Sequence, residues 1–129
     1  MVQLQSIILC YNADWSLKGG LEYLRETIKG DEPCELCRIT YGGLTKKGSW
    51  KKCEKEIKAP VEERYKNKLE PELAEALAGR FPAVVARTDA GYRVLIVEEE
   101  MNAMGGDPLK LYEALVAALE REAIRVTAA

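Results

Sequence analysis

The fold is decided by residues 81–97, which read FPAVVARTDAGYRVLIV. Two runs of β-branched and apolar residues, Ala83 to Arg87 and Tyr92 to Val97, flank the segment Thr88-Asp89-Ala90-Gly91. Turn-forming residues between two such runs indicate a β-hairpin. The sequence therefore predicts a sheet that contains two antiparallel neighbouring strands.

The chain begins with a second strong strand signal. Leu4 to Tyr11 is a nearly continuous apolar run, which is typical of a strand buried on both faces at the centre of a sheet. After Asn12 the apolar residues recur with the 3.6-residue period of a helix, at Leu17, Leu21, Leu24 and Ile28.

The remaining elements alternate between helix and strand. A short helix is expected over residues 32–40, a helix from Ser49 to about Pro60, a charged strand over 61–65 and a helix over 69–78. Asp107 and Pro108 open a last helix, because Asp is a favoured N-cap and Pro a favoured first residue. Its predicted buried stripe is Leu109, Tyr112, Leu115, Val116 and Leu119.

The cysteines carry the strongest chemical signal. Cys34-Glu35-Leu36-Cys37 places two thiols three residues apart, in a chain of 129 residues that contains no histidine. Catalysis therefore has to use thiols, carboxylates, Lys, Tyr or backbone groups. Cys34 in the first helical turn would have a lowered pKa and would attack a disulfide, and Cys37 would resolve the mixed disulfide.

The order of elements resembles the thioredoxin-like superfamily. The resemblance covers residues 81–121, where Phe81-Pro82 precedes a strand, a hairpin and a closing helix, and it extends to residues 5–28. It implies a single α/β domain over 1–129 with three layers, a mixed sheet of about four strands and a helical insert at 31–58. In that superfamily the proline equivalent to Pro82 is typically cis and faces the active site.

The chain departs from that family at one decisive place. Thioredoxins carry both cysteines directly after the first strand, where this chain has Asn12-Ala13-Asp14-Trp15-Ser16. The family's catalytic assignment is therefore not transferable. The segments Tyr11–Asp14 and Cys34–Gly42 also resemble a group of small uncharacterised bacterial proteins, a likeness that implies no substrate.

Two alternatives to redox chemistry remain open. The first is a structural role for the thiols, either packed or in a static disulfide, within a non-catalytic binding module. The groove of such a module would be lined by Tyr11, Asn12, Asp14, Trp15, Phe81 and Pro82. The second is a thiolate metal site formed by Cys34, Cys37 and Cys53, although structural zinc usually has four ligands.

The distribution of charged and apolar residues limits the kinds of partner that we expect. Nine Lys/Arg and four Glu lie between Lys46 and Lys68, but the glutamates interrupt the basic run at helical spacing, as on a solvated helix face. We therefore expect no nucleic-acid partner. The apolar runs are too short to span a membrane, so we expect a cytoplasmic protein. We also expect no cofactor, and exchange at the thiol pair would take a protein or small-thiol disulfide as substrate.

Overall fold

The computed structural model describes residues 2–12, 35–42, 45–65 and 68–125. Its main sheet has the order β4-β1-β5-β6, with β4 parallel to β1 and the other two pairings antiparallel. A short fifth strand, β7, pairs with the first residues of β1 in parallel. The strands are β1 (Val2–Tyr11), β4 (Val61–Tyr65), β5 (Ala83–Thr88), β6 (Gly91–Val97) and β7 (Ile124–Arg125).

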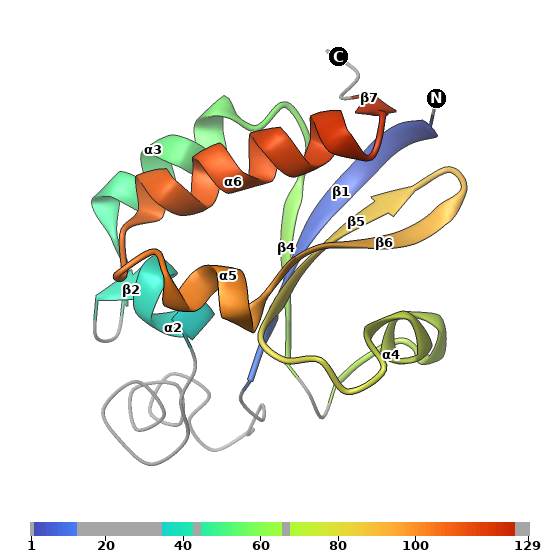
Figure 1. The fold of residues 1–129 in the computed structure, drawn as a ribbon, viewed down its shortest axis with the longest axis horizontal. Coiled ribbons are helices and arrows are strands. Elements are labelled where there is room, and N and C mark those ends of the chain that lie inside the picture. Colours follow the sequence, from blue (N-terminus) through green and yellow to red (C-terminus); the bar gives the residue numbers. More distant parts are fainter. Residues whose placement is uncertain (1, 13–34, 43–44, 66–67, 126–129) are drawn as a thin grey trace.

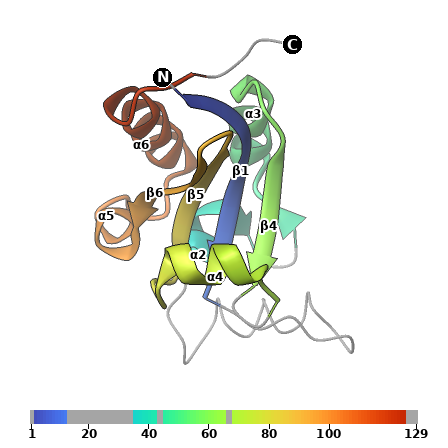
Figure 2. The same ribbon diagram turned by 90° about the vertical axis from the view of Figure 1, so that its right-hand side faces the viewer.

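Helices cover both faces of this sheet (Figures 1 and 2). They are α2 (Glu35–Thr40), α3 (Gly48–Glu56), α4 (Pro71–Leu77), α5 (Glu98–Asn102) and α6 (Pro108–Arg121). A two-stranded hairpin, β2 (Tyr41–Gly42) and β3 (Thr45–Lys46), connects α2 to α3. The predicted α/β architecture with a mixed sheet is confirmed.

The central strand β1 divides the core into two layers. Ile8 and Cys10 face α4, where they pack with Leu73 and Leu77. Ile7, Leu9 and Tyr11 face the layer that contains α2, α3, α5 and α6. All five of these β1 residues are fully buried, which confirms the prediction of a central strand buried on both faces.

The predicted hairpin forms with a two-residue turn at Asp89-Ala90. The Thr88 hydroxyl donates to the Gly91 carbonyl at 2.6 Å and accepts from the Ala90 N–H at 3.1 Å. Gly91 has φ +105°, a conformation that L side chains rarely adopt. At the other end of β5, directly before its first residue, the Phe81–Pro82 peptide bond is cis. This is the isomer that the superfamily resemblance implies at this position.

The buried stripe predicted for α6 is right in part. Leu115 and Leu119 are buried as predicted, but Leu109 and Val116 are 54% and 39% exposed, and Leu111 and Ala118 are buried in their place. The helix is rotated relative to the predicted stripe because its apolar arc is wider than the surface that the sheet covers. The acidic run at 98–100 opens α5, where the Glu100 carboxylate accepts from the Val97 N–H.

The helices after the thiol pair agree better with the sequence. Helix α3 begins one residue before Ser49 and buries Trp50 and Cys53, as its spacing predicts. Helix α4 ends at a left-handed Ala78, one residue before Gly79. The helix predicted over Leu17 to Ile28 lies outside the described residues.

Candidate functional site

Cys37 lies on α2 and is disulfide-bonded. Its side chain is fully buried, together with those of Leu36, Ile39 and Thr40 on the same helix. Cys10 and Cys53 are free thiols, and Cys34, the residue before α2 in the sequence, lies outside the described residues. A buried sulfur with a disulfide partner is protected from bulk solvent on one side of the bond.

Hydrogen bonds fix the end of α2 against the central strand. The Thr40 hydroxyl donates to the Leu36 carbonyl at 2.9 Å, so its oxygen accepts from the Tyr11 hydroxyl at 3.0 Å. At the other end, Arg38 forms an exposed i,i+3 ion pair with Glu35 at 3.3 Å. Exposed pairs of this kind contribute little, so burial and the Tyr11 contact position the helix.

Three tyrosines meet where the parallel strands β1 and β4 end. The ring of Tyr11 packs edge-on against Tyr41, with centroids 6.0 Å apart, and tilted against Tyr65 at 5.8 Å. We call Tyr11, Tyr41 and Tyr65 the tyrosine cluster. Burial raises the pKa of Tyr11 well above its usual value and that of Tyr65 to about 12, and in both cases the charge of Glu63 adds to the effect.

Glu63 connects this cluster to a lysine. The Tyr41 hydroxyl donates to the Glu63 carboxylate at 2.7 Å, and the Lys46 ammonium lies 3.6 Å from the same carboxylate. Burial is the main reason that the pKa of Tyr41 is raised, followed by this hydrogen bond. Partial burial alone would lower the pKa of Lys46, but its bonds to Glu54 and Glu63 raise it on balance.

The residues expected to line a groove are distributed unevenly. Tyr11 is fully buried, Asn12 is half-buried, and Asp14 and Trp15 lie outside the described residues. Phe81 and Pro82 line a surface cavity of about 380 Å³, to whose wall α5 contributes Glu98 and Glu99. The structure thus joins the Phe81–Pro82 part of the predicted groove to an acidic helix that sequence reasoning had not placed there.

The other two cysteines lie on opposite faces of the sheet. Cys10 packs in the α4 layer and Cys53 in the layer of α3 and α6. Burial raises the pKa of Cys10 to about 12 and raises that of Cys53 as well. Among the described residues no group of three or more Cys, Asp or Glu side chains could hold a metal ion.

Ion pairs occupy part of the basic segment. Arg64 bonds to Glu70 at 2.7 Å and to Glu62 at 3.2 Å, and Lys46 bonds to Glu54 at 3.0 Å. These pairs neutralise charge that a polyanion would need. Within the described ranges, no helix has both the length and the apolar character required to cross a bilayer.

Sequence reasoning missed the polar residues around the tyrosines. Thr40, Lys46 and Glu63 were not candidates, although Glu63 stands in a strand in which every residue is half-buried. One feature of the sequence could have pointed to them: Glu63 lies in the strand predicted over 61–65, which pairs with the central one. A carboxylate that is partly buried there needs a hydrogen-bonding partner.

No protein-family model, curated protein or solved structure matches this chain. Its function is therefore inferred from its own residues.

Proposed function

We propose that this protein is a thioredoxin-like domain that carries out thiol–disulfide exchange, or senses redox state, through Cys34 and Cys37. The observation that carries the proposal is the state of the cysteines: Cys37 is oxidised to a disulfide, while Cys10 and Cys53 are free and buried. Cys34 is the remaining cysteine of the chain. The proposed setting is a reducing cytoplasm, where such a pair can be turned over.

The sheet topology supports the thioredoxin-like part of the proposal. A central β1 lies between a parallel β4 and an antiparallel β5, and β6 completes the sheet. Helices α4 and α6 lie on opposite faces (Figure 2). The cysteine pair differs in position from the family pattern, because it lies in the segment between β1 and β4 and not directly after β1.

In the proposed reaction the Cys34 thiolate attacks one sulfur of a protein or small-thiol disulfide. The substrate S–S bond breaks, and the departing thiolate takes a proton from water. The Cys37 thiolate then attacks the Cys34 sulfur, releases the second substrate thiol and leaves the Cys34–Cys37 disulfide. The substrate gains two electrons, and a dithiol reductant of the cell regenerates the protein.

Burial supports these separate roles. A resolving thiol has to reach only its neighbour, so the full burial of Cys37 is compatible with resolution but not with attack on a large substrate. A purely structural disulfide between Cys34 and Cys37 would stabilise the fold only slightly, because the loop that it closes is so short. Closing a four-residue ring restricts the unfolded chain by only about 2 kcal/mol, against roughly 4.7 kcal/mol for a loop of 100 residues.

Insulin reduction with dithiothreitol as electron donor tests the activity. We expect Cys34→Ser to lower the rate to that of dithiothreitol alone, and Cys37→Ser to accumulate a mixed disulfide with substrate. Cys53→Ser is the control, because that thiol takes no part in the proposed exchange, and it should keep the wild-type rate. If wild type and Cys34→Ser reduce both insulin and oxidised glutathione at equal rates, the structural alternative holds.

Intact mass separates the remaining alternatives. Reduction of the untreated protein should add two hydrogens, and metal analysis of the same sample tests for a thiolate site. Stoichiometric zinc in a protein whose mass does not change on reduction would favour the thiolate metal site over the exchange proposal.

A further inference from the structure

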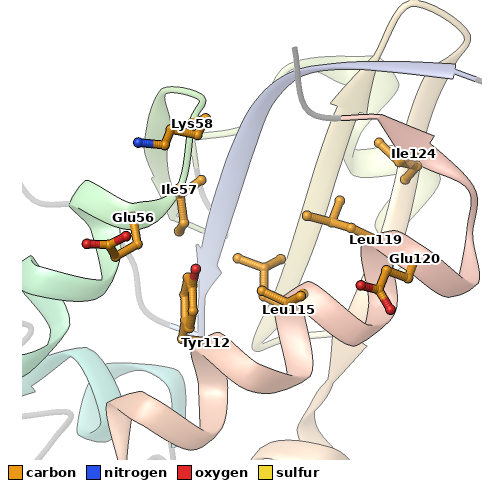
Figure 3. Close-up of a pocket in the computed structure, with 9 residues that line it drawn as sticks. Glu56, Ile57, Lys58, Tyr112, Leu115, Leu119, Glu120 and Ile124 are labelled. Atoms are coloured by element: carbon orange, nitrogen blue, oxygen red, sulfur yellow. The ribbon is translucent and has the colours of Figure 1, made fainter. Parts of the chain in front are cut away.

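A second cavity lies on the side of the molecule where α3 and α6 meet (Figure 3). It has a volume of about 240 Å³, and its walls are largely apolar. Side chains from α6, from the segment after α3 and from β7 contribute to it: Ile57, Tyr112, Leu115, Val116, Leu119 and Ile124. None of the described cysteines, Cys37 included, lines it.

The cavity accounts for one of the two exposed apolar residues of α6, Val116. The helix has a wider apolar arc than the sheet covers, and part of the excess faces this cavity. Leu115 and Leu119 are buried at its base, whereas Val116 is 39% exposed at its edge.

Charged and polar groups surround the apolar walls without partners of their own. The side chains of Glu56, Glu120 and Lys58 make no ion pair or hydrogen bond with any part of the chain that the structure describes, and neither does the Tyr112 hydroxyl. Figure 3 shows the Lys58 side chain extending away from α6. The Glu56 carboxylate points outward on the same side as Lys58, so Glu120 is the charged group of the rim that lies on α6, beside Leu115 and Leu119.

We propose that this cavity binds a small amine with an aromatic or aliphatic body. The body packs against Leu115 and Leu119, and the ammonium group faces the carboxylate of Glu120, which lies beside these two leucines on α6 (Figure 3). An apolar cavity of 150 Å³ holds benzene, so 240 Å³ accommodates a body of about ten heavy atoms. Apolar walls with a few polar groups at the edge are the usual form of a small-molecule site.

Size also argues against a protein occupant. Among the described residues only Leu109 and Val116 are large exposed hydrophobics, and only Val116 lines the cavity. A stable protein interface requires a contiguous apolar core with many residues on each side. One exposed valine beside a small cavity does not provide that core.

Three probes of similar size and different charge test the proposal: 2-phenylethylamine, 2-phenylethanol and phenylacetate. Each is titrated into the wild-type protein while backbone amide resonances are recorded by NMR. We expect 2-phenylethylamine to shift Tyr112 and Ile124 with a Kd of about 1 mM, a value typical of a ligand of this size. The alcohol should bind about two- to five-fold more weakly, and phenylacetate more weakly still.

Variants at the rim and at the edge locate the site. Glu120→Gln should remove the preference for the amine over the alcohol, whereas Glu113→Gln, an exposed α6 control outside the cavity, should keep it. Val116→Trp should fill the edge and abolish binding of all three probes. Leu109→Trp is its control, because Leu109 is an exposed residue of the same helix that does not line the cavity.

Each contrary result overturns the proposal. Equal affinity for all three probes would refute the proposed preference for an amine. Tyr112 and Ile124 resonances that stay unshifted at a probe concentration 20-fold above the expected Kd would show that the cavity is not a binding site. Unchanged binding in Val116→Trp would place the probes elsewhere. Sedimentation of a wild-type dimer that Val116→Trp converts to monomer would assign this face to a second copy of the chain.

Discussion

Replacing Tyr41 by Phe tests the hydrogen bond between the tyrosine cluster and Glu63. The substitution keeps the buried ring and removes only the hydroxyl that donates to the Glu63 carboxylate at 2.7 Å. A hydrogen bond to a charged group contributes about 1.5–3 kcal/mol, and the lower end applies here because the Glu63 side chain is 24% exposed. We expect Tyr41→Phe to lower the free energy of unfolding at pH 7 by about 1.5 kcal/mol.

This difference should disappear in alkali. An unfolded tyrosine loses its proton near pH 10, whereas burial raises the pKa of Tyr41 in the folded protein. Below pH 10 both states are protonated and the stabilisation is complete; above it the folded state holds a proton that the unfolded state has lost, so stability falls as the pH rises. The wild type should lose about 0.4 kcal/mol at pH 10 and about 1.4 kcal/mol at pH 11 from this residue alone.

The two stability curves should therefore meet near pH 11. Urea denaturation followed by far-ultraviolet circular dichroism at several values between pH 7 and 11 measures both. Tyr112→Phe is the matched control at pH 7, since the Tyr112 hydroxyl makes no hydrogen bond within the described residues, and it should change stability by less than about 0.5 kcal/mol. A wild-type advantage that stays constant from pH 7 to pH 11 would refute the reasoning.

Three further predictions concern single residues. Burial raises the pKa of Cys10 to about 12, and burial also raises the pKa of Cys53, so iodoacetamide at pH 8 should label both thiols in urea and neither in the folded protein; intact mass counts the adducts. Asp107→Ala should cost about 1 kcal/mol in urea denaturation, because the Asp107 carboxylate accepts from the Leu109 N–H at 3.0 Å, and Asp107→Asn should retain most of that stability. Ala78→Gly should stabilise the protein by roughly 0.5–1 kcal/mol, since Ala78 has φ 50° at the end of α4, and a lower urea midpoint would contradict this.

Elements with a strong local pattern were predictable from the sequence. The apolar run of β1 and the turn at Asp89-Ala90 each determine their own geometry, and Asp107 with Pro108 marks the start of α6. The orientation of α6 was less predictable, because apolar residues occupy so much of its circumference that several rotations satisfy the pattern. The sheet and α3 select one of these rotations, and that selection depends on tertiary contacts.

The candidate site was predictable only in part. The Cys34–Cys37 spacing is visible in the sequence, but the burial of Cys37 follows from the packing of α2 against the rest of its layer. The Tyr41–Glu63 hydrogen bond joins residues 22 positions apart. No local pattern predicts such a pair, because it depends on the register of β4 beside β1.

The position of α2 does not depend on its disulfide alone, and this bears on the exchange proposal. Leu36 and Ile39 are fully buried, and burial of such side chains contributes roughly 1.5–3 kcal/mol each. The Thr40–Tyr11 hydrogen bond adds a further constraint at the end of the helix. Reduction of Cys37 therefore removes one of several constraints, and the thiol it releases stays on a helix that is still held against β1. A resolving cysteine requires that property, because it must be in position before its disulfide forms.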